Sequence, residues 1–257
     1  METVSAIIYN YKENALKVNL KGNPYKMISH PFILLFYLIT GKFNEILSFF
    51  HKKISEKNFE LNDSAQTAPE NGFIDDQSKK KEIRYGKKSF SHSGCGLAAV
   101  YNAMMLLGLP MPLAEIIRYF EKHGASFFAS FGTAPQSAVR FFRKQGVNTE
   151  STMNKRKFKE LAERSDILLF TIMNDRRRIR SMVHTMCVEC LHGRDPLKPA
   201  ISYIVHNSHG KAEAYECYED MMYSLGDGEG RAEGVYMLAI NRTGAGEDPL
   251  PDGKNLM

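Results

Sequence analysis

The sequence predicts an α+β fold, in which a helical N-terminal half is followed by an antiparallel β-sheet. In the helical segments between about residues 29 and 164, apolar residues recur with the period of a helix, and beyond residue 164 they follow the period of a strand. The apolar segments of the second half are joined by short stretches rich in Gly, Asp, Asn and Pro. Such short connections join antiparallel neighbours, because parallel strands need long crossovers. Helices first and strands afterwards are typical of the α+β class.

Composition narrows the possible partners. The chain has 257 residues, of which 43% are hydrophobic, so it can bury a sizeable core. Its formal net charge is +5, and its densest basic runs, 79–81 and 176–180, lack the interleaved aromatic residues of a single-strand nucleic-acid binder. The longest apolar run, 32–39, is far shorter than the roughly 20 residues of a membrane span. We expect no nucleic-acid partner and no membrane span, and the oligomeric state stays open.

The cysteine content indicates a reducing compartment. Four cysteines are too few for a protein of this length that is built on disulfides. The four are Cys95, Cys187, Cys190 and Cys217. The opening residues lack the basic region and apolar core of a signal peptide. We therefore expect a cytoplasmic protein with free thiols.

The first third of the chain has its own pattern. Residues 4–20 predict a short strand pair, or a strand and a turn. A helix is signalled from Ser29, with Pro31 in its first turn, and Gly41 is expected to interrupt it before 44–54 resumes the apolar pattern. Apolar helical stripes usually pack against a core, so packing on the main domain is expected. The alternative is a docking or pro-segment helix that covers the active cleft.

A change of composition suggests the domain organisation. Residues 62–82 are polar and rich in turn formers, which predicts a linker or a long surface loop. This places an accessory region, partly helical, at 1–61 and a larger domain at 83–242. The tail, 243–257, is rich in Gly, Asp and Pro and is expected to be loose.

The larger domain is expected to contain four helices and then four strands. The third helix would have Thr133 as its N-cap and Pro135 in its first turn. The expected helices are 95–107, 113–123, 133–145 and 155–164. The expected strands are 167–172, 182–190, 200–207 and 234–241, and the connections that carry turn formers are 192–196, 207–210 and 226–230.

Cys95 is the strongest candidate for a reactive group. It lies between two glycines where a loop of small polar residues becomes an apolar helix that ends at Gly108. The partial positive charge of a helix N-terminus favours a thiolate, and the glycines permit close approach of another chain segment. A helix that is apolar nearly all round is expected to be buried. A small buried hydrophobe is the simpler interpretation of a lone cysteine, but this context favours a nucleophile.

A cysteine nucleophile needs a base and a group that orients the base. His184 lies near the start of the strand 182–190, where alternation places it on one face with Met186, Val188 and Cys190. Asn207 ends the next strand and would neighbour His184 in a hairpin, so its amide could accept a hydrogen bond from the imidazole. The structural alternatives are a histidine at the rim of the sheet and an asparagine in a turn.

A metal site is the rival interpretation of these residues. Cys187 and Cys190 form a C-x-x-C, and further potential ligands follow at His192, His206, His209 and Cys217. Structural zinc sites prefer two such pairs on tight turns, whereas this single pair falls inside a strand, where its members face opposite sides. No phosphate-binding glycine loop is present either. We expect no metal and no cofactor.

Taken together, four segments resemble the papain-like C39 group of bacterial cysteine peptidases, and more closely the C39-like proteins of bacteria. They are Ser93–Ala103 around the cysteine, Gly132–Pro135, Val183–Thr185 and Asn207. The resemblance covers roughly residues 83–241 and leaves the first third unexplained.

The resemblance implies a papain-like fold and a function. Cys95 would be the nucleophile, His184 the base and acid, and Asn207 the residue that orients it. The protein would be a cysteine hydrolase that cleaves peptide or related amide bonds of a peptide or protein substrate through an acyl-thioester on Cys95. The alternatives are an acyltransferase on the same fold and a non-enzymatic peptide-binding module with a degenerate site.

One departure from that group concerns the oxyanion. The group commonly has a glutamine six residues before the cysteine, where this chain has Ser89. The candidate donors are therefore the Cys95 main-chain N–H and the hydroxyls of Ser89, Ser91 and Ser93. The loss of one oxyanion donor costs about 100-fold or more in rate, which motivates the binding-module alternative. The third residue is Asn rather than the Asp common in the group.

Overall fold

A computed structural model describes residues 30–65, 72–173, 183–192, 201–208, 210–225 and 233–242. By the contacts between residues, 34–257 form one compact unit and 1–33 another. Several expectations lie outside the described residues, namely the strand pair at 4–20, the turn at 226–230, most of the turn at 192–196 and the tail at 243–257.

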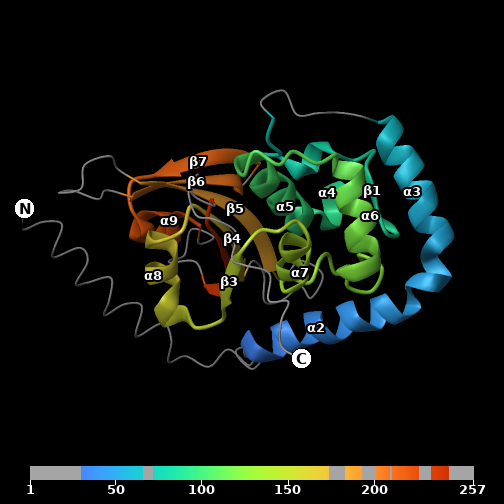
Figure 1. The fold of residues 1–257 in the computed structure, drawn as a ribbon, viewed down its shortest axis with the longest axis horizontal. Coiled ribbons are helices and arrows are strands. Elements are labelled where there is room, and N and C mark those ends of the chain that lie inside the picture. The colour runs from blue at the N-terminus through green and yellow to red at the C-terminus, as the bar shows by residue number, and fades with distance from the viewer. Residues whose placement is uncertain are drawn as a thin grey trace, which may run out of the picture. The chain divides into compact units, whose positions relative to one another are not determined.

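Two helices open the described chain (Figure 1). Helix α2 (His30–Leu47) is joined by a 3₁₀ turn, η2 (Ser48–His51), to α3 (Lys52–Ser64). The expectation that Gly41 interrupts the first helix is wrong, because α2 runs through it. A Cβ at Gly41 would lie 3.3 Å from the Cβ of Ala134, so this glycine allows α2 to pack closely rather than ending it.

The described part of the polar stretch after α3 is packed against the helices. Its residues 72–79, here called the 72–79 segment, contain a 3₁₀ turn, η3 (Gln77–Lys79). Ile74 is 2% exposed, and both its main-chain groups bond the side chain of Asn102 at 2.8 and 3.1 Å. This loop is therefore anchored rather than loose, while the division into domains at 62–82 stays a prediction.

The expected helices of the larger domain are present, with one displaced start. A small hairpin, β1 (Arg84–Tyr85) and β2 (Lys88–Ser89), and a short helix, α4 (Phe90–Ser93), precede them. The expected helices are α5 (Cys95–Leu106), α6 (Leu113–His123), α7 (Ser137–Lys144) and the pair η4 (Lys155–Lys157) and α8 (Phe158–Glu163). Thr133 is not the N-cap of α7, which begins only at Ser137. Instead it pairs with Ala125 in a β-bridge, and its hydroxyl lies 3.0 Å from that of Tyr85.

The second half forms one six-stranded antiparallel sheet, which confirms the α+β class. Its order is β3-β8-β4-β5-β6-β7, with β3 (Thr149–Thr152), β4 (Ile167–Met173), β5 (Val183–His192), β6 (Ile201–Ser208), β7 (Lys211–Tyr215) and β8 (Gly234–Ile240). The sequence did not suggest the two edge strands, β3 and β7, or the short helix α9 (Tyr218–Ser224). Both edge strands are short and largely polar, so neither has the apolar run by which the central strands were identified.

Helices cover both faces of the sheet (Figure 1). Helix α5 packs on the face that presents Leu169, Cys187 and Leu238, while α8 and α9 pack on the face that presents Phe170 and Val188. Residues 96–104 of α5 are all buried, as its apolar sequence predicts, because the helix lies between the sheet and α6. This central position holds the N-terminus of α5 rigidly beside β5.

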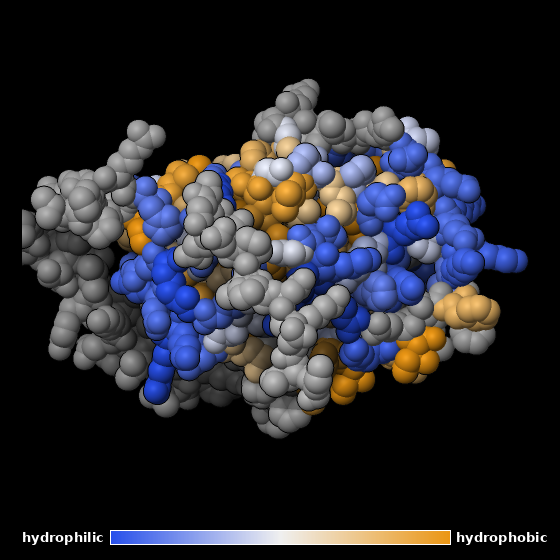
Figure 2. All heavy atoms as spheres, viewed as in Figure 1, coloured by the Kyte–Doolittle hydropathy of each residue, from blue (hydrophilic) through white to orange (hydrophobic). Residues whose placement is uncertain are grey.

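Helix α2 buries one face and leaves apolar side chains exposed on another. Figure 2 shows such side chains along the lower edge, where α2 runs. Among the described side chains of α2 and η2, the exposed large apolar ones are Leu35, Leu38, Ile39, Phe43, Ile46 and Phe49. None of the described helices is both long enough and apolar enough to cross a bilayer.

Candidate active site

Cys95 is the first residue of α5, and its two flanking glycines are required by close contacts. A Cβ at Gly94 would lie 2.5 Å from the carbonyl oxygen of Phe90, and a Cβ at Gly96 would lie 3.0 Å from the Cβ of Thr133. The predicted close approach is thus present on both sides. Cys95 itself is partly exposed, and its N–H belongs to the first turn of the helix, where main-chain donors have no partner within the helix.

His184 lies close enough to the Cys95 thiol for each group to shift the pKa of the other. Burial raises the pKa of Cys95, but the hydrogen bond and charge of His184, with the N–H groups of Thr185 and Gly96, bring it below its ordinary value. Burial lowers the pKa of His184, but Cys95 and the main chain of Asn207 raise it above its ordinary value. Both shifts favour the thiolate–imidazolium ion pair, the form in which a cysteine attacks.

The second nitrogen of the imidazole is fixed by the main chain of β6. His184 Nε2 lies 2.9 Å from the carbonyl oxygen of Asn207, so Nε2 carries a proton and donates it, which leaves Nδ1 for the thiol. The sequence suggested that the side-chain amide of Asn207 would accept this bond; the main-chain carbonyl does so instead. Asn207 has a φ of +62°, and the pairing of β6 with β7 shifts between Val205 and Ser208. This irregularity turns the carbonyl out of the ladder.

The side chain of Asn207 is occupied by Gln77. Asn207 Oδ1 accepts a bond from Gln77 N at 3.1 Å, and Asn207 Nδ2 donates to Gln77 Oε1 at 2.9 Å. Gln77 Nε2 in turn donates to the carbonyl of Ser91 at 3.3 Å. Sequence reasoning missed Gln77 because it lies in a polar stretch interpreted as a linker. The apolar pair Phe73-Ile74 within that stretch is the one signal that it packs.

A cleft of about 450 Å³ opens beside the imidazole. Its lining combines polar groups from Gln77, Ser91 and Asn207 with apolar side chains from Ile172 and Met186. Its volume falls in the range of ligand pockets. On helix α2, Tyr37 is buried, and burial together with the charge of Cys95 raises its pKa.

The three serine candidates for the oxyanion site differ in position. Ser91 lines the cleft, and its hydroxyl lies 2.8 Å from that of Ser89. Ser93 is buried, and its hydroxyl donates to the carbonyl of Ser89 at 3.4 Å. Of the three side chains, the structure therefore brings Ser91 to the cleft that holds His184.

No family model, curated protein or solved structure matches this chain.

The cysteines of the C-x-x-C lie on opposite sides of the sheet, as their spacing in a strand predicts. Cys187 belongs to the core beneath α5, and Cys190 to the core beneath α8 and α9. Burial raises the pKa of both thiols, and Cys217 accepts a bond from Asp220 N at the start of α9. Among the residues that the structure describes, no three His, Cys, Asp or Glu side chains are grouped so that they could hold a metal.

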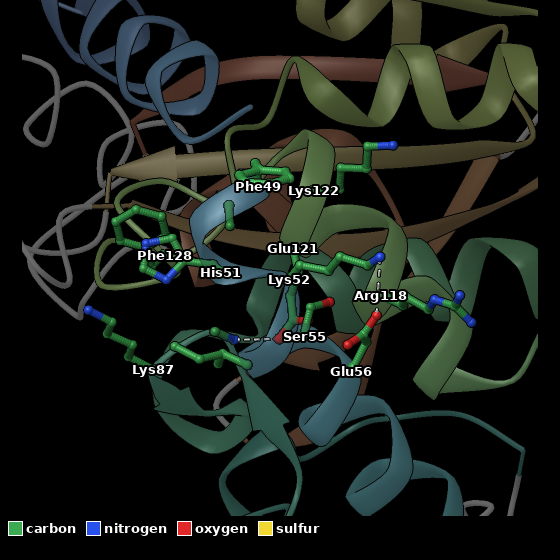
Figure 3. Close-up of a pocket in the computed structure, with 13 residues that line it drawn as sticks. Phe49, His51, Lys52, Ser55, Glu56, Lys87, Arg118, Glu121, Lys122 and Phe128 are labelled. Carbon is green, nitrogen blue, oxygen red and sulfur yellow. Dashed lines mark hydrogen bonds and ion pairs between the residues drawn. The ribbon is translucent and has the colours of Figure 1, made fainter. Parts of the chain in front are cut away.

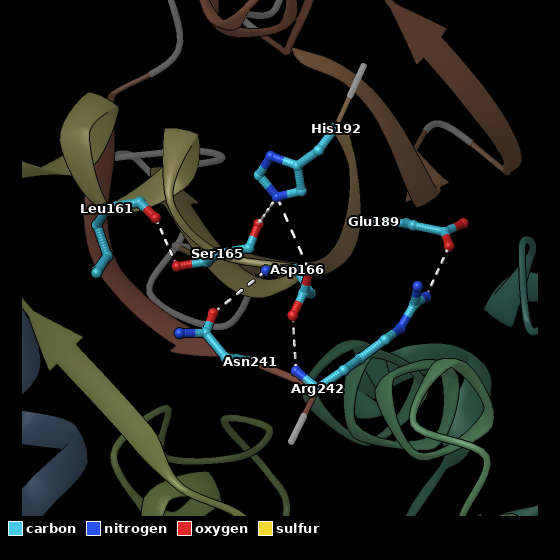
Figure 4. Close-up of polar contacts among 7 residues, drawn as sticks. All are labelled: Leu161, Ser165, Asp166, Glu189, His192, Asn241 and Arg242. Atoms are coloured by element: carbon cyan, nitrogen blue, oxygen red, sulfur yellow. Dashed lines mark hydrogen bonds and ion pairs between the residues drawn. The ribbon is translucent and has the colours of Figure 1, made fainter. Parts of the chain in front are cut away.

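A second polar cluster brings a serine, a histidine and an aspartate together without forming a catalytic triad (Figure 4). His192 Nε2 faces the carbonyl of Ser165 at 3.1 Å, while the Ser165 hydroxyl donates to Leu161 O at 2.6 Å. Asp166 accepts a bond from the Arg242 N–H at 2.7 Å. These contacts tie together the ends of β4, β5 and β8, and the hydroxyl is turned away from the imidazole.

A separate cavity of about 380 Å³ lies between α3, α6 and the β1–β2 turn (Figure 3). Its buried Glu121 accepts bonds from Asn58 Nδ2 at 2.6 Å and from Gly86 N at 2.7 Å. Burial raises the pKa of this carboxyl group. The cavity shares no lining residue with the cleft beside His184, and Glu121 holds its three walls together.

Proposed function

We propose that this protein is a papain-like cysteine hydrolase related to the C39-like group, with Cys95 as nucleophile and His184 as base and acid. The observation that supports it best is the reciprocal pairing of thiol and imidazole. The pKa of Cys95 is lowered and that of His184 raised, while Nε2 is held by a fixed carbonyl. A structural cysteine in a core has the opposite shift, as Cys187 does.

The proposed reaction proceeds in two steps. The Cys95 thiolate attacks the carbonyl carbon of an amide bond, and the His184 imidazolium gives its Nδ1 proton to the leaving amine as the C–N bond breaks. The neutral imidazole then removes a proton from water, whose oxygen attacks the thioester and releases the carboxylic acid and the thiolate. The Asn207 carbonyl holds the ring in one orientation throughout.

The oxyanion of each tetrahedral intermediate would be stabilised at the start of α5. The Cys95 N–H is one donor, and the positive end of the helix adds to it. Of the three serine candidates, Ser91 lines the cleft, so we propose its hydroxyl as the second donor. The apolar wall formed by Ile172, Met186 and Leu225 suits a peptide side chain, so we propose a peptide or protein substrate.

Alkylation of Cys95 by iodoacetamide tests the proposal. The full chain carries Cys217→Ser, because Cys217 is partly exposed and a serine can cap α9 in its place. We expect labelling of Cys95 to continue well below the pH at which an ordinary thiol stops reacting, and His184→Ala to abolish this behaviour. An ordinary rate that is unchanged in His184→Ala would overturn the proposal and favour the binding module.

A peptide-substrate screen separates hydrolysis from acyl transfer. Free carboxylic acid should form at the same rate with and without an added amine acceptor. Conversion that depends on the amine would instead identify an acyltransferase.

A further inference from the structure

We infer that Gln77 is a positioning residue of this site, which holds the side chain of Asn207 so that the Asn207 main-chain carbonyl stays on the His184 imidazole. The inference rests on the proposed function of Cys95 and His184. It assigns a role to a residue more than a hundred positions away from Asn207 in the sequence, on a stretch that composition marked as a linker.

Gln77 makes a hydrogen bond to each of the two polar atoms of the Asn207 side chain. Its oxygen accepts from the Gln77 main chain at 3.1 Å, and its nitrogen donates to the Gln77 side chain at 2.9 Å. Asn207 is 3% exposed, so water cannot readily replace these partners. Two bonds from one residue fix both the position and the plane of the amide.

The main chain of Asn207 needs this support. A φ of +62° lies in the left-handed region, which asparagine tolerates better than most residues but adopts only where its surroundings hold it. The register shift of β6 removes regular ladder bonds at this point. The direction of the carbonyl, and with it the hydrogen bond to Nε2, therefore depends on how the side chain is held.

Gln77 is itself anchored by contacts that do not involve Asn207. In the 72–79 segment, Phe73 stacks on His206 with ring centres 4.5 Å apart, and Asp75 lies 2.8 Å from His206 Nδ1. Asn102 bonds both main-chain groups of Ile74. The segment is thus fixed to α5 and β6, so Gln77 can hold Asn207 rather than simply follow it.

The test is the pH profile of Cys95 alkylation in the Cys217→Ser chain. Loss of the carbonyl contact removes one of the interactions that raise the pKa of His184, which weakens the ion pair. We expect Gln77→Ala to move the acid limb of the profile upward by about half to one pH unit, a roughly three- to tenfold lower rate on that limb. Gln77→Met, which keeps the length of the side chain but not its amide, should do the same. Gln145→Ala, at the end of α7, is the control and should leave the limb in place.

A second background tests whether Gln77 acts through Asn207. Glycine adopts positive φ without a side chain, so Asn207→Gly removes the amide and leaves nothing for Gln77 to hold. Adding Gln77→Ala to Asn207→Gly should therefore shift the limb no further. A further shift of the same size in that background would show that Gln77 acts by another route and overturn the inference.

The inference and the proposed function fail in different ways. If the acid limb of the starting protein depends on His184 but is the same in Gln77→Ala and Gln77→Met, only the positioning role is refuted. If the starting protein already titrates as an ordinary thiol and His184→Ala changes nothing, the proposed function itself is refuted, and the role of Gln77 in it falls with it.

Discussion

Asn102 is the side chain that anchors the 72–79 segment to α5, and its loss should destabilise the protein strongly. It is completely buried, its Oδ1 accepts from Ile74 N at 2.8 Å, and its Nδ2 donates to Ile74 O at 3.1 Å. Asn102→Ala leaves both the N–H and the carbonyl group of Ile74 without their hydrogen-bond partners. Because Ile74 is also buried, water cannot easily take their place.

The magnitude follows from the two main-chain groups left behind. A buried polar group that loses its partner costs about 1–3 kcal/mol, so the free energy of unfolding should fall by about 2–6 kcal/mol. The free energy of unfolding of a small protein falls by about 2 kcal/mol for each molar of urea, so the urea concentration at the midpoint of unfolding should fall by roughly 1–3 M. The 72–79 segment carries Gln77, so the acid limb of Cys95 alkylation should shift as well.

Urea unfolding followed by circular dichroism measures the effect, with Asn154→Ala as the matched control. Asn154 is exposed and caps the 3₁₀ turn η4, so its loss should cost about 1 kcal/mol or less. The reasoning is refuted if Asn102→Ala and Asn154→Ala lose the same stability to within about 0.5 kcal/mol, since the bonds to Ile74 would then carry no special weight.

Three further predictions concern other parts of the molecule. Gly96→Ala should lower the rate of Cys95 alkylation several-fold, because the added Cβ would lie 3.0 Å from the Cβ of Thr133. Gly108→Ala is the control: its φ of +70° should cost about 1–2 kcal/mol of stability, but the added Cβ meets open space, so the rate of Cys95 alkylation should stay unchanged. Burial raises the pKa of Glu213 but its hydrogen bonds lower it to about 2, so the stability it contributes is complete above its ordinary pKa and lost as pH falls through about 2. Glu213→Gln should therefore flatten the acid limb of the stability curve, and an unchanged limb in calorimetry would contradict this. Cys187 and Cys190 should be labelled by iodoacetamide only after unfolding, which mass mapping of the peptides checks, and labelling of either in the native state would be inconsistent with their burial.

The sequence predicted the central elements well because their signals are local. Pro112 and Gly124 bound α6, and the apolar run at 167–172 marks β4 without reference to the rest of the chain. The failures have a common cause. Gly41 is a helix breaker by propensity, but close packing on Ala134 overrides propensity, and Thr133 has the chemistry of an N-cap but is used by a β-bridge and Tyr85.

The candidate site divides in the same way between sequence and tertiary structure. The sequence by itself indicated Cys95 as the reactive candidate and His184 as its candidate base, because flanking glycines, a helix start and a strand start are readable from neighbouring residues. Only the tertiary structure decided that Asn207 holds the imidazole by its carbonyl and that Gln77 holds Asn207. A left-handed main chain at a register shift, and a contact between residues far apart in the chain, leave no periodic trace in the sequence because they arise only when the segments pack together.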